Sequence, residues 1–235
     1  MKLPFTEKLN ISIYRAYRHT LWRSPALHKL YLNLRGFPID FENKDLVVQG
    51  FGRSGNTFVT EAIKVCSNKR IDIFSHLHVP VVIHEAINSN TPICFLIRAP
   101  EDAVTSLALH SNWSATRCLD HYVEYHRIIK EVSDLVCIFE FSKFTRDINC
   151  LLQGLSTHLG MNFPAVSHKN VETIVFDRIE KHQLEKYGEI DETTIHRPSL
   201  IRAQAKNKLL SEIAMQEHLL LKARSLFEFF KSKAI

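Results

Sequence analysis

The sequence lacks three features that would each place it in a large class of proteins. No run among its 235 residues has the roughly 20 apolar residues that a membrane-spanning helix needs. The first residues, 1–7, contain no apolar core of a secretory signal peptide. No internal repeat and no low-complexity tract is present. We therefore expect a cytoplasmic protein with an ordinary globular fold.

The five cysteines contain no C-x-x-C pair, and their number is odd. Cys66, Cys94, Cys137 and Cys150 lie in apolar runs, which predicts reduced, buried thiols in a reducing compartment. A metal site is also not expected. His76 and His78 form an H-x-H pair, but no third ligand follows at a suitable spacing, although His84 and Glu85 lie nearby in the sequence.

The composition is that of a soluble domain with a modest basic excess. The apolar content is 45%, the net charge is +5 and the pI is about 8.9. Such an excess suits a small polyanion, a nucleic acid or an anionic membrane surface, and does not distinguish between them. The stretch 8–35 mixes aromatic and leucine residues with Lys and Arg. It predicts either peripheral contact with an anionic bilayer or a helix that packs its apolar side on the domain.

Short β-prone runs alternate with helical patterns along the chain, which predicts a central parallel sheet of about four to five strands covered by helices on both faces. The third run is apolar throughout and is expected to be central. We expect one domain, with a basic helical segment at 1–44, a core at 45–160, and a helical part at 161–235 that contains a mobile segment at 187–198. The expected strands are 45–49, 70–74, 92–97 and 135–139, and the expected helices are 115–132, 142–159, 171–186 and one long helix over 200–231.

A glycine-rich turn joins the first expected strand to a helical pattern over 58–66. Residues 50–57 read G-F-G-R-S-G-N-T, close to the phosphate-binding loop G-x-x-x-x-G-K-[ST]. Asn56 replaces the lysine that holds the β- and γ-phosphates in nucleotide hydrolases, while Arg53 supplies a positive charge three residues earlier. A strand, a glycine turn and a helix N-terminus favour the binding of an anion. The missing lysine argues against the binding of a γ-phosphate.

Polar residues also follow the other expected strands. The third strand ends at Arg98, and Ser106 follows eight residues later on a helix that Pro100 begins. Ser106 meets Arg98 only if the register of that helix allows it. No strand ends in the aspartate that nucleotide hydrolases use to hold Mg²⁺, and Glu140 is the nearest substitute. Arginines at two strand ends indicate a polyanion that is bound without a metal.

These motifs resemble those of the sulfotransferases that use 3′-phosphoadenosine 5′-phosphosulfate (PAPS). Residues 52–58, G-R-S-G-N-T-F, are similar to the family's 5′ loop P-K-S-G-T-T-W, and still more to its variant P-R-S-G-N-T. Residues 98–106 match the 3′-phosphate motif R-x-P-x-D-x-x-x-S at every fixed position. Residues 75–77, S-H-L, fall where the family has its catalytic T-H-L, and Glu140-Phe141 loosely match its Y-E-D-L segment. The resemblance covers residues 45–160.

The resemblance implies a role for each matching residue. His76 would be the base that takes the acceptor's proton, and Arg53 would stabilise charge on the bridging oxygen as the sulfuryl group leaves. Arg98 and Ser106 would bind the 3′-phosphate, which distinguishes PAPS from ATP. Phe58 replaces the family's tryptophan that stacks on adenine. The 5′-phosphosulfate would be held by Arg53, Ser54, Gly55, Asn56 and Thr57.

The chain departs from the family late in the sequence, where the R-K-G motif has no clean copy. Arg197, Arg202 and Lys206 could supply its charge, or could form a solvated basic face. The implied function is sulfuryl transfer from PAPS, without a metal, to a hydroxyl or amine of a small molecule, sugar or lipid rather than a nucleic acid. A P-loop kinase or NTPase and a non-catalytic binding protein are the alternatives. Six residues on and near the helix over 115–132 either line an acceptor pocket or pack the domain, and the sequence does not distinguish the two roles: Trp113, Arg117, His121, Tyr122, Tyr125 and His126.

Overall fold

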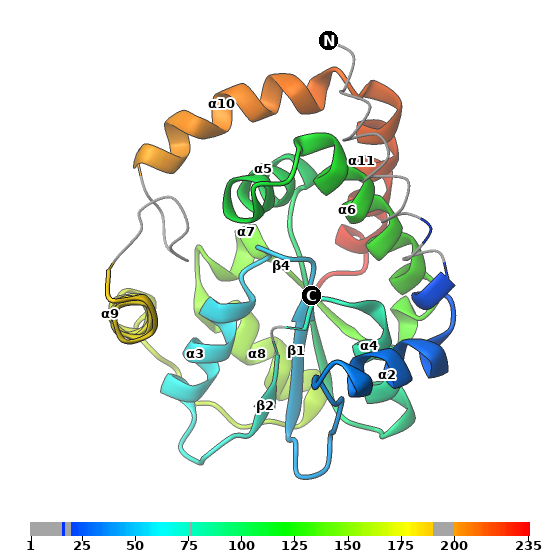
Figure 1. Cartoon of the computed structure of the whole chain (residues 1–235). Coiled ribbons are helices and arrows are strands. Elements are labelled where there is room, and N and C mark those ends of the chain that lie inside the picture. Colours follow the sequence, from blue (N-terminus) through cyan, green and yellow to red (C-terminus); the bar gives the residue numbers. More distant parts are fainter. Residues whose placement is uncertain (1–15, 17–19, 76, 190–199) are drawn as a thin grey trace.

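Four parallel strands in the order β2-β1-β3-β4 form the central layer of the protein. The computed structural model describes residues 16, 20–75, 77–189 and 200–235, and Figure 1 shows the strands between two layers of helices. This is the three-layer α/β/α architecture that the alternation of strands and helices predicts. The strands are β1 (Leu46–Gly50), β2 (Ile73–Phe74), β3 (Ile93–Ile97) and β4 (Cys137–Glu140).

Each face of the sheet buries its own apolar cluster. Leu46 and Val48 of β1 pack toward one face, and Val47 packs toward the other, so β1 is buried on both sides. The near-continuous apolar sequence of β1 and β3 follows from this double burial. Among the described residues, four helices cover the first face: α3 (Asn56–Cys66), α7 (Phe141–Phe144), α8 (Ile148–Leu159) and α9 (His168–Tyr187). Five cover the second face: α2 (Pro25–Leu34), α4 (Pro80–Asn88), α5 (Pro100–Ser111), α6 (Ala115–Lys130) and α11 (Glu217–Lys231). Helix α10 (Leu200–Ala214) packs against α5 and α6.

The strand order places a topological switch point between β1 and β3. The chain moves from β1 to β2 on one side and then crosses back to β3 on the other side. As a result α3, which follows β1, and α5, which follows β3, lie on opposite faces of the sheet. In open α/β sheets a ligand binds outside the carboxyl ends of the strands at such a point.

The structure confirms the fold class, the four strands and the central place of the third strand. The second strand is shorter than expected, since only Ile73 and Phe74 pair with β1. The helix over 80–88 was not expected from the sequence, because Val81, Val82 and Ile83 resemble a strand; Pro80 at its first turn was the available signal. Residues 190–199, which include most of the segment expected to be mobile, lie outside the described residues.

Two expected helices are each divided in the structure. The expected helix over 142–159 is interrupted at Asp147, which has extended backbone and accepts a hydrogen bond from the N–H of Asn149 (3.0 Å) as the N-cap of α8. The long helix expected over 200–231 is wrong as one element. It ends at Ala214, and α11 begins at Glu217 after a turn in which the N–H of Gln216 donates to the carbonyl of Ile213.

The cysteines are free thiols, but they are not all in the core. Cys66, Cys94 and Cys118 are buried, and Cys137 is half-buried. Cys150 was expected to be buried from its apolar sequence context and is instead exposed on α8. Within the part of the chain that the structure describes, no helix is long and apolar enough to cross a membrane.

Candidate functional site

The glycine-rich loop lies at the carboxyl end of β1 and leads directly into α3. Two of its residues have left-handed backbone, Arg53 with φ of +71° and Gly55, the N-cap of α3, with φ of +93°. A positive φ is uncommon for a residue with a side chain, and such strain concentrates at binding sites. The first helical hydrogen bond joins the N–H of Val59 to the carbonyl of Gly55 (2.9 Å), so the N–H groups of residues 56–58 form the open first turn of α3.

Two glycines are required by close contacts around this loop. A Cβ on Gly50 would lie 2.5 Å from the carbonyl oxygen of Leu96, so Gly50 allows β1 and β3 to approach each other. A Cβ on Gly55 would lie 3.1 Å from ring carbons of both Phe141 and Phe144. Gly55 therefore combines a left-handed φ with aromatic rings that a Cβ would force to shift by a few tenths of an ångström.

Asn56 holds the loop together from inside. Its side chain is buried, and Nδ2 donates to the carbonyl of Phe51 (3.3 Å). At this position a lysine would extend toward a phosphate, whereas the shorter asparagine closes the loop on itself. Asn56 Oδ1 and the buried hydroxyl of Ser54 have no hydrogen-bond partner among the described residues. Thr57, also predicted to bind, lies half-buried in the first turn of α3.

Three residues from distant parts of the sequence meet beside this loop. Arg53 Nε donates to the hydroxyl of Ser106 (3.2 Å), and Arg98 Nη1 donates to the carbonyl of Arg53 (2.8 Å). The register of α5 therefore brings Ser106, which is 5% exposed, to the carboxyl ends of the strands. The sequence left this register open, and the structure brings residues 50–57 and residues 98–106 together.

Arg98 is held in place on two further sides. Its guanidinium carbon lies 4.0 Å from the centre of the Phe141 ring, and the hydroxyl of Tyr122 donates to its carbonyl (2.8 Å). The cation–π contact orients the Arg98 side chain, and the hydrogen bond from Tyr122 positions its backbone. The Phe141 ring therefore both crowds Gly55 and supports Arg98.

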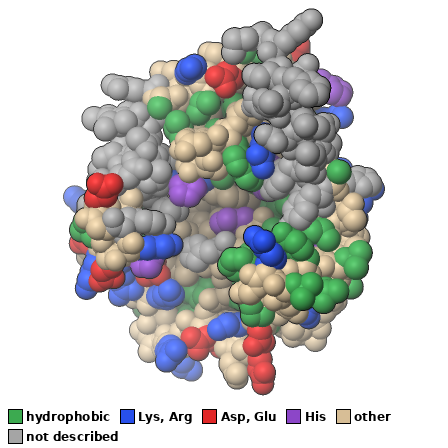
Figure 2. Space-filling view, in the orientation of Figure 1, with side chains coloured by type: hydrophobic (Ala, Val, Ile, Leu, Met, Phe, Trp, Pro, Cys, Tyr) green, Lys and Arg blue, Asp and Glu red, His purple; other side chains and the backbone are tan. Residues whose placement is uncertain are grey.

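A histidine that the sequence linked only to a metal lies against the loop. His78 Nδ1 is 2.9 Å from the carbonyl of Gly50; it acts as the donor, which leaves the lone pair of a neutral ring on Nε2. His78 Cδ2 would lie 4.0 Å from a Cβ on Gly52. The buried side chain of Gln49 donates to the carbonyls of Leu77 and Val79, so the segment that carries His78 is fixed against β1. On the face of the molecule that Figure 2 draws, histidine side chains lie in a central hollow.

Some candidate residues are elsewhere or outside the described residues. His76 and Arg197 are not described, and Arg202 lies in α10 without a described side chain. Phe58 is 7% exposed and packs between Phe144 and Phe176 at ring-centre distances of 6.4 and 5.8 Å, so it lies in the core.

The two remaining charged candidates each have a partner. The Lys206 ammonium forms an ion pair with Asp102 in the first turn of α5, which holds α10 against that helix. Glu140 accepts a hydrogen bond from the hydroxyl of Ser142 (2.6 Å). Among the described residues, no group of three or more His, Cys, Asp or Glu side chains could hold a metal ion.

The aromatic residues of α6 pack the core rather than line a pocket. Tyr122, Tyr125 and His126 are fully buried and surround the ring of Phe51 at centre distances of 5.0 to 6.0 Å. Burial lowers the pKa of His126 to about 4, because the charged ring would lose its hydration. Trp113, outside this group, supports the guanidinium of Arg117 at 3.8 Å.

Comparison with known proteins adds no assignment to this geometry. No protein-family model matches the chain, and a search of curated proteins returns no match.

Proposed function

We propose that the protein is a sulfotransferase that moves the sulfuryl group of PAPS to a hydroxyl or amine acceptor. The observation that carries the proposal is the meeting of Arg53, Arg98 and Ser106 at the carboxyl ends of β1 and β3, beside the N-terminus of α3. Two guanidinium groups, a hydroxyl and a helix N-terminus in one place favour a ligand with more than one anionic group. PAPS carries two such groups, at its 5′ and 3′ positions.

The division of the site into two parts favours PAPS over ATP. In the proposal the loop residues Arg53 to Thr57 hold the 5′-phosphosulfate, and Arg98 with Ser106 holds the 3′-phosphate that ATP lacks. The amide of Asn56 donates to the carbonyl of Phe51, and the side chain carries no charge for a γ-phosphate. The acceptor in this proposal is a small molecule, a sugar or a lipid. Arg197 and Arg202 are proposed to add charge near the 3′-phosphate.

The reaction needs one base and one cation. The acceptor oxygen or nitrogen attacks sulfur, the bond from sulfur to the bridging oxygen breaks, and 3′,5′-ADP leaves with the bonding electrons. Arg53, which lies in the loop, stabilises the charge that forms on the bridging oxygen. The acceptor's proton passes to a histidine. The resemblance assigns this role to His76, and the fixed Nδ1–H donor of His78 makes the Nε2 of His78 the competing site.

A transfer assay with labelled PAPS and a panel of acceptors tests the proposal. We expect His76→Ala to abolish transfer while leaving 3′,5′-ADP binding unchanged, and we expect His78→Ala, as the matched variant, to retain transfer. The reverse result would reassign the base to His78. A wild-type chain that binds 3′,5′-ADP but transfers no label to any acceptor would contradict the catalytic part of the proposal.

A further inference from the structure

Helix α2 carries a row of leucines that faces away from the domain. Leu27, Leu30 and Leu34 are 51%, 56% and 79% exposed, and Phe37 just beyond the helix is 57% exposed. The spacing of i, i+3 and i+7 places the three leucines on one side of the helix. Single exposed leucines are ordinary, but a contiguous group indicates an interaction surface. We call these four residues the α2 leucine surface, and Figure 2 shows an apolar patch where Figure 1 places α2.

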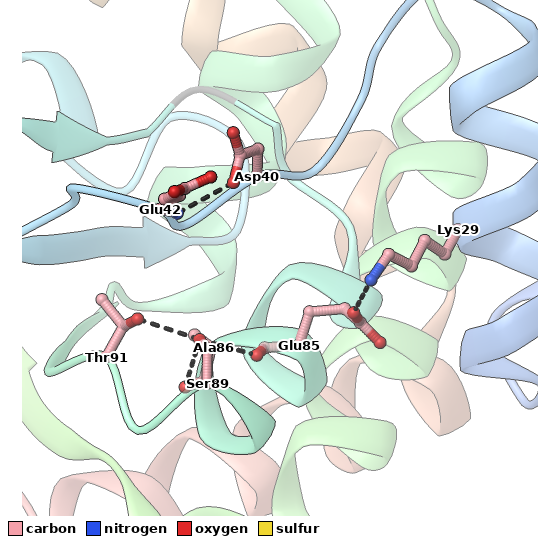
Figure 3. Close-up of polar contacts among 7 residues, drawn as sticks. All are labelled: Lys29, Asp40, Glu42, Glu85, Ala86, Ser89 and Thr91. Atoms are coloured by element: carbon pink, nitrogen blue, oxygen red, sulfur yellow. Dashed lines mark hydrogen bonds and ion pairs between the residues drawn. The ribbon is translucent and has the colours of Figure 1, made fainter.

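The opposite side of α2 fixes the helix on the domain. His28 and Leu32 are buried there, and Trp22 just before the helix is 2% exposed. Lys29 forms an ion pair with Glu85 of α4, drawn in Figure 3. These contacts hold α2 from behind, so the leucine surface belongs to an anchored helix and points outward.

The charged residues of the sequence segment that carries this surface are all cations, up to the exposed Asp40 that follows it. Residues 8–39 contain no Asp or Glu, although the chain has 25 of them, and contain six Lys and Arg residues, at positions 8, 15, 18, 23, 29 and 35. Arg23 and Arg35 are exposed and lie on either side of the leucine row along the sequence. A second copy of this surface would bring the same cations together, which disfavours self-association through α2. A uniformly anionic surface is complementary to it.

We propose that the α2 leucine surface docks on an anionic lipid bilayer. The leucines and Phe37 enter the boundary between headgroups and acyl chains, and Arg23 and Arg35 contact the anionic headgroups. This inference rests on the burial and charge of α2 and does not depend on the proposed sulfuryl transfer.

Vesicle co-sedimentation with the full chain tests the inference. We expect the protein to bind vesicles of phosphatidylcholine with phosphatidylglycerol at least about tenfold more strongly than vesicles of phosphatidylcholine alone, because two exposed arginines lie beside the leucines. Leu34→Asp should weaken the binding by at least about tenfold, since it places a charge at the most exposed position of the surface. Arg23→Glu/Arg35→Glu should remove most of the preference for anionic vesicles.

The chain offers a matched control on another helix. Leu221 of α11 is 55% exposed, so Leu221→Asp introduces the same charge at a similar exposure and should bind vesicles as the wild type does. Circular dichroism of each variant confirms that it is folded, and Leu30→Asp replaces Leu34→Asp if the latter is not. Wild-type binding by both α2 leucine variants would overturn the proposal. The absence of wild-type binding to anionic vesicles would also overturn it. The same holds if the wild type does not bind vesicles but self-associates with rising concentration, and Leu34→Asp abolishes that self-association.

Discussion

Replacing Gly55 with alanine perturbs the loop at its most constrained position. The left-handed φ of +93° costs a residue with a Cβ about 1–2 kcal/mol. The new Cβ would also lie 3.1 Å from ring carbons of Phe141 and Phe144, and Phe144 is 1% exposed and cannot move freely. Overpacking of this kind costs about 1–3 kcal/mol. We therefore expect Gly55→Ala to lower the free energy of unfolding by about 2–5 kcal/mol.

Gly160 provides the control for this variant. It has a similar φ of +66°, at the end of α8, and a Cβ there would have no atom within 4 Å. Gly160→Ala should therefore show only the backbone cost of about 1–2 kcal/mol. Urea unfolding of the wild type and both variants measures the free energies, and the difference between the variants isolates the crowding by Phe141 and Phe144.

The same pair of variants distinguishes an effect on ligand binding at the loop from a general loss of stability. Gly55→Ala should weaken the binding of 3′,5′-ADP at a temperature where the variant is folded, whereas Gly160→Ala should not. A Gly55→Ala chain that loses no more stability than Gly160→Ala would refute the packing of the loop against the two phenylalanines. The support that Phe141 gives to Arg98 would then also be in doubt.

Two further predictions concern buried groups. Burial lowers the pKa of His126, and that of His28, to about 4 from an ordinary value of 6.5, so the unfolded chain binds these protons more readily. The stability that these neutral histidines contribute is complete above about pH 6.5 and is lost as the pH falls toward 4. Because of His126 alone, the free energy of unfolding measured in urea should fall by about 2 kcal/mol between pH 8 and pH 5. A His126→Asn chain with the same pH dependence as the wild type would contradict this. A thiol-reactive dye at pH 8 should label the exposed Cys150 of the folded protein, whereas Cys118, whose pKa burial raises to about 12, should react only after unfolding; equal labelling rates would contradict the burial of Cys118.

The parts of the fold that local sequence determines were predicted correctly. β1 and β3 are buried on both faces, so their sequences are continuous apolar runs that no solvent-exposed strand would have. The glycine-rich turn between β1 and α3 was equally clear, because its glycines lie between an apolar run and a helical pattern. Both features are visible in residues that are close together in the chain, although the contacts that constrain Gly50 and Gly55 come from distant residues.

The parts that depend on distant contacts were not predictable. The contact of Arg53 with Ser106 depends on how α5 rotates against the sheet, which its sequence does not specify. No glycine or proline marks the end of α10, and residues 215–216 turn so that Phe230 of α11 can pack on Phe95 of β3. Local β-propensity obscured α4, and packing against β1 and β3 outweighs that propensity.

The resemblance and the geometry also differ at one point of the site. The sequence linked Phe58 to stacking on adenine, but its ring lies among Phe144 and Phe176 in the core. The ring of Phe58 takes part in the packing of α3 on α9 through Phe176. Contact between Phe58 and a base therefore remains a prediction for a liganded structure.

Comparison of three nucleotides tests the central claim most directly. The claim is that the loop and the pair formed by Arg98 and Ser106 bind a nucleotide that carries a 3′-phosphate. In thermal unfolding, 3′,5′-ADP should stabilise the protein more than AMP or ATP with Mg²⁺, and a ligand at 100 times its Kd adds about 2.7 kcal/mol to the free energy of unfolding. Ser106→Ala should reduce the advantage of 3′,5′-ADP over AMP. Stronger stabilisation by ATP with Mg²⁺, or equal stabilisation by AMP and 3′,5′-ADP, would contradict the account.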